Sequence, residues 1–205
     1  MKVYSKIISF ILILSIIFSV LLVTHISASA SGIIPQSTIQ LTGTCYYDDA
    51  YDILNKVNNL RTFMGLHPLS MEPQLMEDAM QRAAELMLVY SHDRPDGSSC
   101  FDINDDAFAE NIAIGYGSTE AVMDGWLGSE IHYANIMSED FNCIGIGTVV
   151  HNGVPCWVQL FGTKPYNEEI DIPENTTKDF DIYVGDQDYE LSLNIPQSYF
   201  VGDST

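Results

Sequence analysis

Residues 143–162 read CIGIGTVVHNGVPCWVQLFG, and this stretch decides how the chain folds. Two runs of β-branched, aromatic and other apolar residues, 143–150 and 156–161, lie on either side of the dipeptide Asn152-Gly153. Asn-Gly between two such runs is typical of a two-residue hairpin turn, because both residues tolerate a positive φ. The sequence therefore predicts an antiparallel hairpin that closes the folded core.

Two helices are expected before this hairpin. From residue 48 to residue 64 apolar residues recur at helical spacing, and the pattern stops at Gly65, a common helix-ending residue. A second apolar stripe opens at Pro73, which is favoured in the first turn of a helix, and ends just before His92.

The remaining core elements lie between the second helix and the hairpin. A short run at 107–115 precedes Ser118 and Thr119, either of which can cap a third helix, and a further helical turn surrounds His132. Helices would then flank a small antiparallel sheet. The predicted fold class is α+β.

The first thirty residues have the pattern of a signal peptide. Lys2 and Lys6 precede an apolar run, and residues 28–30 are Ala-Ser-Ala, a small-x-small cleavage pattern. We therefore expect a secreted, extracellular protein without stable membrane insertion after cleavage. The alternative is an uncleaved anchor, because the run approaches the length of a spanning helix.

Two further segments flank the expected domain at 45–162. Residues 31–44 form a polar leader without periodicity, which we interpret as a tether. Residues 163–205 form an acidic tail in which alternation survives at 180–184 and 189–193, so the tail could hold one weak hairpin.

Charge limits the class of partner. The net charge is −20 at pH 7, whereas nucleic acids and anionic membrane surfaces bind clustered Lys and Arg. No nucleic-acid function is expected.

Four cysteines, Cys45, Cys100, Cys143 and Cys156, lie in the expected mature chain, where export favours disulfides. Three connectivities are possible, and we favour Cys45–Cys100 with Cys143–Cys156. The hairpin argues against the second pair, because it places Cys143 about 20 Å along its strand from the position opposite Cys156, at ~3.3 Å per residue.

Three segments gather side chains that a hydrophobic core does not need. They read SHDRPDG at 91–97, ENIA at 110–113 and WLGSEIHYANI at 126–136. Together with IGIG and WVQLFG further along, their order and intervals closely resemble the bacterial branch of the CAP superfamily, the SCP-like extracellular domain of cysteine-rich secretory and pathogenesis-related proteins. The match covers roughly residues 45–162.

This resemblance implies a three-layer α-β-α sandwich with a cleft that holds two histidines and acidic residues. Position by position, these residues are His92, Glu110 and His132. Eukaryotic members of the family usually carry a glutamate three residues after the tryptophan, where this chain has Ser129, and Glu130 follows it directly. Ser129 shares a helical face with His132, whereas Glu130 would reach the cleft only if the helix is broken there.

Two functions remain open at this point. Neutral imidazoles bind zinc or another divalent cation, and a nearby carboxylate can complete the ligand set or orient a ring. His92 and His132 would hold such an ion, and Glu110 would be the catalytic base of a metal-dependent hydrolase or protease. We favour the other reading, an extracellular module that binds a protein, lipid or envelope ligand, because the resemblance implies contacts of that kind and the catalytic set looks incomplete.

Overall fold

The computed structural model describes residues 37–168 and 171–185, all within one compact unit. Within these residues six strands form one sheet in the order β3-β5-β4-β1-β6, with β2 beside β4. Neighbouring strands are antiparallel except for β2 and β4, which are parallel. The strands are β1 (Ser37–Cys45), β2 (Ser70–Met71), β3 (Ala109–Ile114), β4 (Cys143–His151), β5 (Val154–Gly162) and β6 (Thr176–Val184).

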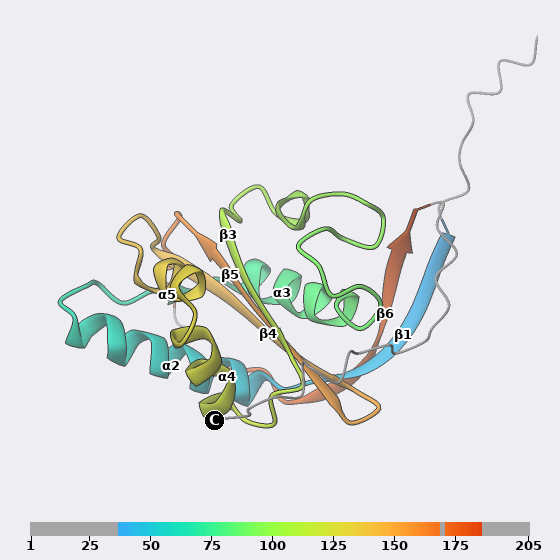
Figure 1. The fold of residues 1–205 in the computed structure, drawn as a ribbon, viewed down its shortest axis with the longest axis horizontal. Coiled ribbons are helices and arrows are strands. Elements are labelled where there is room, and N and C mark those ends of the chain that lie inside the picture. The colour runs from blue at the N-terminus through green and yellow to red at the C-terminus, as the bar shows by residue number, and fades with distance from the viewer. Residues whose placement is uncertain (1–36, 169–170, 186–205) are drawn as a thin grey trace, which may run out of the picture. The chain divides into compact units, whose positions relative to one another are not determined.

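Helices lie on both faces of this sheet (Figure 1). One face is covered by α3 (Pro73–Glu85), and the other by α2 (Tyr47–Phe63), α4 (Thr119–Leu127) and α5 (Glu130–Met137). A short 3₁₀ helix, η1 (Cys100–Ile103), interrupts the loop between α3 and β3. The predicted α-β-α sandwich is therefore confirmed. No helix in the described ranges is long and apolar enough to cross a bilayer.

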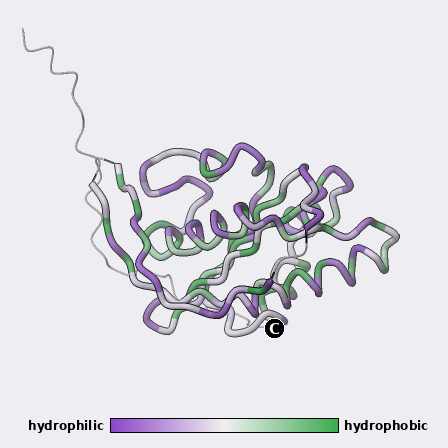
Figure 2. The backbone as a smooth tube through the Cα atoms, turned by 180° about the vertical axis from the view of Figure 1, so that it is seen from behind, coloured by the Kyte–Doolittle hydropathy of each residue, from purple (hydrophilic) through white to green (hydrophobic). Residues whose placement is uncertain are grey.

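Two glycines of β4 allow α3 to lie directly on the sheet. A Cβ at Gly145 would lie 2.1 Å from the carbonyl oxygen of Leu75, and one at Gly147 would lie 2.1 Å from that of Ala79. Larger residues would push the helix away from the sheet. On the opposite face α2 is amphipathic, and Figure 2 shows hydrophilic and hydrophobic residues alternating along it.

The predicted hairpin is confirmed. Strands β4 and β5 pair from Cys143 with Gly162 to His151 with Val154. The turn residues Asn152 and Gly153 have φ of 50° and 80°, which is the positive range that Asn-Gly turns use.

The structure differs from the expected tether at 31–44, because residues 37–44 belong to β1. This strand buries Leu41, Gly43 and Cys45 on one face, and it pairs with β6 along its whole length. The predicted strand at 180–184 is therefore real but pairs with β1. Its predicted partner at 189–193, like the signal peptide at 1–30, lies outside the described residues.

The structure also corrects the disulfide prediction. All four cysteines are buried free thiols. Cys156 lies opposite Val149, whereas Cys143 lies opposite Gly162, so Cys143 is six positions along β4 from the residue opposite Cys156. At ~3.3 Å per residue this is about 20 Å, too far for a bridge. Cys45 lies beside Tyr47 and Lys178, whereas Cys100 lies near Glu110.

Candidate functional site

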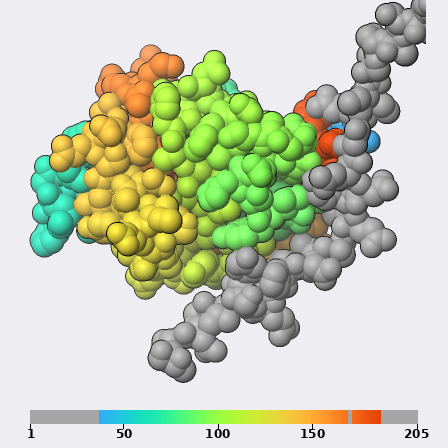
Figure 3. Space-filling view, turned by 45° about the horizontal axis from the view of Figure 1, so that its top comes forward, coloured from blue at the N-terminus to red at the C-terminus, as the bar shows by residue number. Residues whose placement is uncertain are grey.

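The candidate site lies at the edge of the sheet formed by β3. Because β3 has a strand on one side only, the loop after α3 reaches it from one face and α5 from the other. Figure 3 shows that loop next to the α4–α5 segment on one side of the molecule. Between them lies a cleft of about 340 Å³. Its lining residues are His92, Asp93, Ser99, Cys100, Phe101, Phe108, Ala109, Glu110 and Asn135.

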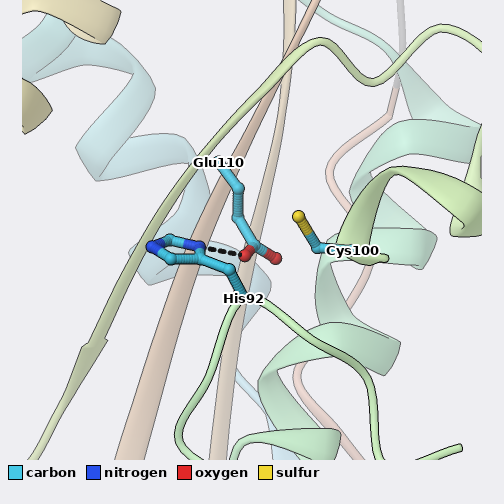
Figure 4. A group of neighbouring side chains, drawn as sticks. All are labelled: His92, Cys100 and Glu110. Atoms are coloured by element: carbon cyan, nitrogen blue, oxygen red, sulfur yellow. Dashed lines mark hydrogen bonds and ion pairs between the residues drawn. The ribbon is translucent and has the colours of Figure 1, made fainter. Parts of the chain in front are cut away.

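Glu110 is the centre of the contacts at the base of this cleft. Its Oε1 accepts a hydrogen bond from Arg82 Nε at 2.8 Å, and its Oε2 accepts one from His92 Nδ1 at 2.8 Å. Because an ionised carboxylate only accepts, Nδ1 of His92 carries the proton. Figure 4 shows the other ring nitrogen of His92 pointing away from Glu110 and Cys100. Glu110 therefore fixes the orientation of the His92 ring.

Arg82 extends this contact into a chain of buried charges. Its Nη1 donates to Glu85 at 2.9 Å, and its Nη2 donates to the carbonyl oxygen of Ser91 at 2.9 Å. Glu85 also accepts two hydrogen bonds from Arg94, at 2.7 and 3.1 Å. The side chains of Arg82, Glu85 and Glu110 are at most 1% exposed. Pairing is what makes their burial tolerable, since a lone buried charge is strongly destabilising.

These contacts set the charge states at the site. Burial alone would raise the pKa of Glu110, but the hydrogen bonds from His92 and Arg82 outweigh it and hold this pKa below its ordinary value. The same hydrogen bond to Glu110 raises the pKa of His92. Burial, with the charge of Glu110, raises the pKa of the Cys100 thiol to about 12. Glu110 is thus ionised at neutral pH, and Cys100 is a neutral thiol.

His132 lies on α5, and its side chain makes no hydrogen bond or ion pair with Glu110 or His92 within the described residues. Its backbone carbonyl accepts from Asn111 Nδ2 at 3.2 Å, and Asn111 Oδ1 accepts from Asn135 Nδ2 at 2.8 Å. Burial, with a smaller effect of His92, lowers the pKa of His132. The effect of His92 means that the two rings are close enough to interact electrostatically.

Ser129 and Glu130 lie at a break between two helices. α4 ends at Leu127 and α5 begins at Glu130, with Ser129 as its N-cap residue. The break that would let Glu130 approach the cleft therefore exists, but neither Glu130 nor Ser129 is among the residues that line it. Glu130 is exposed.

Three side chains could share a metal ion by proximity alone. The donor atoms of His92, Cys100 and Glu110 lie within 4.8 Å of one another. Both oxygens of Glu110 contact the Arg82 guanidinium, at 2.8 and 3.4 Å, so a cation bound there would face a fixed positive charge. The outward nitrogen of His92 has no such conflict, and a carboxylate behind a ligating imidazole is a common arrangement. Binding of zinc by His92 with His132 stays a prediction.

Four residues that define the site could not be recognised from the sequence: Arg82, Glu85, Phe101 and Phe108. Arg82 and Glu85 lie on the helix predicted from residue 73, but charges spaced three apart on a helix are normally interpreted as a solvated pair. Phe101 and Phe108 lie in a loop without periodicity, so nothing in the local pattern distinguished them. The arginine inside an otherwise apolar stripe was the one usable signal.

The α-β-α fold and the cleft at the β3 edge define a protein of the SCP-like class. Residues 54–161 match the Cysteine-rich secretory protein family, abbreviated CAP. The chain belongs to this family, as the order of its motifs predicted.

Comparisons with individual proteins agree. The chain is 30% identical over 117 residues to the uncharacterized protein YkwD of Bacillus subtilis, and this match covers 53% of the chain and 45% of YkwD. The chain thus spans less than half of that relative. An extracellular SCP-domain protein from Bacillus anthracis is 26% identical, with a TM-score of 0.51 over 57% of this chain and 41% of that one. An outer surface protein of Borrelia burgdorferi shares the fold at 19% identity and a TM-score of 0.50, over 57% of this chain and 93% of that one.

Proposed function

We propose that this protein is an extracellular binding module that holds an apolar part of its ligand in the cleft at the β3 edge. An extracellular location is supported by the two structural relatives, whose names describe an extracellular protein and an outer surface protein. The apolar export pattern at residues 1–30 points the same way.

The observation that carries the proposal is the state of Glu110. A general base must offer a free lone pair to water and needs a pKa near the working pH. Both oxygens of Glu110 are held by Arg82 and His92, and its pKa lies below the ordinary value. Glu110 is thus poorly placed to activate water, and its geometry supports a structural role beneath a binding cleft.

Two aromatic side chains indicate what the cleft binds. Phe101 is 41% exposed and Phe108 is 54% exposed, and both line the cleft. Exposed aromatic residues that gather at a concave site favour an apolar ligand group. A lipid-type or envelope ligand fits this surface.

The test is titration of the full chain with the neutral fluorescent probe N-phenyl-1-naphthylamine. We expect a saturable fluorescence increase, and Phe108→Ala should weaken the binding roughly tenfold or more, since burial of an aromatic ring contributes about 1.5–3 kcal/mol. Phe63→Ala is the matched control, because Phe63 is 85% exposed at the end of α2 and does not line the cleft. Equal loss in both variants, or no saturable binding, would overturn the proposal.

A second arm of the experiment addresses hydrolysis. We expect no cleavage of casein by the full chain in the presence of zinc. Cleavage that EDTA abolishes and that Glu110→Gln removes would replace the binding module with a metal-dependent hydrolase.

A further inference from the structure

We infer that the cleft recognises an organic ammonium group, a protonated amine carried on the apolar part of the ligand. This inference rests on the proposed binding function and adds the charge and hydrogen-bonding character of the ligand. It is drawn from three features of the cleft: an accessible amide oxygen, an unpaired carboxylate and the two exposed phenylalanines.

The amide oxygen belongs to Asn135, and neighbouring residues fix its orientation. A backbone carbonyl can only accept, so the Asn111 atom 3.2 Å from the His132 oxygen must be Nδ2. Oδ1 of Asn111 therefore faces Asn135 and accepts from its Nδ2 at 2.8 Å. The same Nδ2 of Asn111 donates to Gln159 Oε1 at 2.9 Å, which is consistent with this orientation.

This arrangement leaves Oδ1 of Asn135 as a free acceptor. Within residues 37–168 and 171–185 it accepts no hydrogen bond, and it is not one of the buried side-chain atoms that lack a partner. It is therefore accessible to solvent on a residue that lines the cleft. A ligand that donates hydrogen bonds would satisfy it, and a carboxylate or phosphate would not.

The charges around the cleft also favour a cation. Arg82 and Arg94 are paired with the carboxylates of Glu85 and Glu110, so the two guanidinium charges behind the cleft are already matched. Asp93 lines the cleft, is exposed, and makes no side-chain hydrogen bond or ion pair with other described residues, although its charge acts on His92. The chain as a whole carries a net charge of −20. This field attracts cationic ligands and repels anionic ones.

The two phenylalanines suit an ammonium group as well as its apolar substituent. The face of an aromatic ring attracts a cation by about 0.5–1 kcal/mol at an exposed site. Phe101 and Phe108 could thus contact the hydrocarbon part of a ligand and its charged end. Aromatic faces beside a carboxylate and an amide acceptor form a set that anions do not match.

Calorimetric titration of the full chain with n-octylammonium, n-octanoate and n-octanol tests the inference, because the three probes share one hydrocarbon chain. We expect n-octylammonium to bind roughly tenfold more tightly than n-octanoate, as two exposed electrostatic contacts would give. Added sodium chloride should weaken the binding of n-octylammonium and leave the binding of n-octanol unchanged.

Two charge-matched variants locate the effect. Asp93→Asn should weaken the binding of n-octylammonium about two- to fivefold, the range expected for an exposed ion pair, and should leave the binding of n-octanol unchanged. Glu130→Gln removes the same charge from the exposed start of α5, outside the cleft, and should change neither. Equal effects of the two variants would contradict the inference.

The outcomes separate this inference from the proposed function. If N-phenyl-1-naphthylamine binds but n-octanoate or n-octanol binds as tightly as n-octylammonium, the ammonium preference is wrong and the binding module stands. If none of the four probes binds, both are wrong.

Discussion

At the scale of single residues, Arg82 holds together the charges behind the cleft. Its side chain is 0% exposed and contacts Glu85 and Glu110, which are 1% exposed. The guanidinium of Arg82 therefore compensates the negative charge of both buried carboxylates. Arg94 and His92 add contacts at the two ends of the chain of charges.

Replacement of Arg82 should destabilise the protein strongly. Arg82→Met leaves two buried carboxylates without their shared partner, and we expect a loss of about 3–5 kcal/mol in the free energy of unfolding, measured with urea. Adding Glu110→Gln to this variant should recover part of the loss. Lys56→Ala, which removes a more exposed pair with Asp52, should have little effect. A similar effect of Arg82→Met and Lys56→Ala would contradict the assigned role.

The contact between His92 and Glu110 predicts a pH dependence. The pKa of His92 is raised above 6.5 in the folded state, so its stabilisation is fully present below pH 6.5 and is lost as pH rises through the folded pKa. The pKa of Glu110 is lowered from 4.5, so its stabilisation is present above pH 4.5 and is lost as pH falls through the folded pKa. The pair therefore stabilises the fold most between these limits.

Urea unfolding of the wild type and His92→Gln at pH 6 and pH 9 measures this effect. The difference between the two proteins should shrink at pH 9, where the imidazole has lost its charge. His67→Gln is the control, because His67 is exposed and its ring contacts the Phe141 carbonyl rather than a charged group. If the difference in the free energy of unfolding between wild type and His92→Gln grows as pH rises, the predicted direction of the pH dependence is wrong.

The sequence was sufficient to predict residues that belong to a recognisable motif. It was not sufficient for residues whose role depends on how deeply they are buried. His92 and Glu110 were predicted and do meet. Cys100 was interpreted as half of a disulfide, but it lies near Glu110 as a thiol. The position of Arg82 in an apolar stripe hinted at burial, but its partner Glu110 could not be deduced, because it is 28 residues away.

At the scale of elements, the close contact of α3 with β4 sets the position of the loop that carries His92. Gly145→Ala would place a methyl group 2.1 Å from the carbonyl oxygen of Leu75, which is a backbone atom and cannot rotate away. We expect a loss of about 1–3 kcal/mol or more in urea unfolding, the range for overpacked cores. Gly117→Ala should be neutral by comparison, since nothing lies within 4 Å of its added Cβ. Equal effects would show that α3 does not lie this close.

The register of β4 and β5 predicts the state of the cysteines. Since Cys143 and Cys156 lie six positions apart across the hairpin and no cysteine is bridged, thiol titration of the denatured protein should count four thiols. Two thiols or none would contradict this arrangement and restore a disulfide.

Elements with a strong local pattern were predicted well, and long-range pairings were not. The 152–153 turn fixed the β4–β5 hairpin, and Ser118 is the N-cap of α4. The pairing of β1 with β6 joins segments more than 130 residues apart, such as Thr42 with Asp179, and no local signal selects one strand for another. Residues 37–44 were therefore interpreted as a tether.

At the scale of the whole molecule, the cleft results from the position of β3 at the edge of the sheet. The loop from the α3 face and helix α5 from the other face both reach this edge, and they bring His92 and Asn135 to one site. The family resemblance predicted that these segments form one cleft. Composition and periodicity alone predicted only that helices flank a sheet. The charges of the cleft could be assigned only once its neighbours were known.

The most direct test of a binding site at the β3 edge is mapping of backbone amide chemical shifts during titration with N-phenyl-1-naphthylamine. We predict that the largest shifts fall at His92, Phe101, Phe108 and Asn135 and saturate together, because these residues line one cleft. Shifts confined to the exposed end of α2 around Phe63, or spread evenly over the molecule, would contradict it.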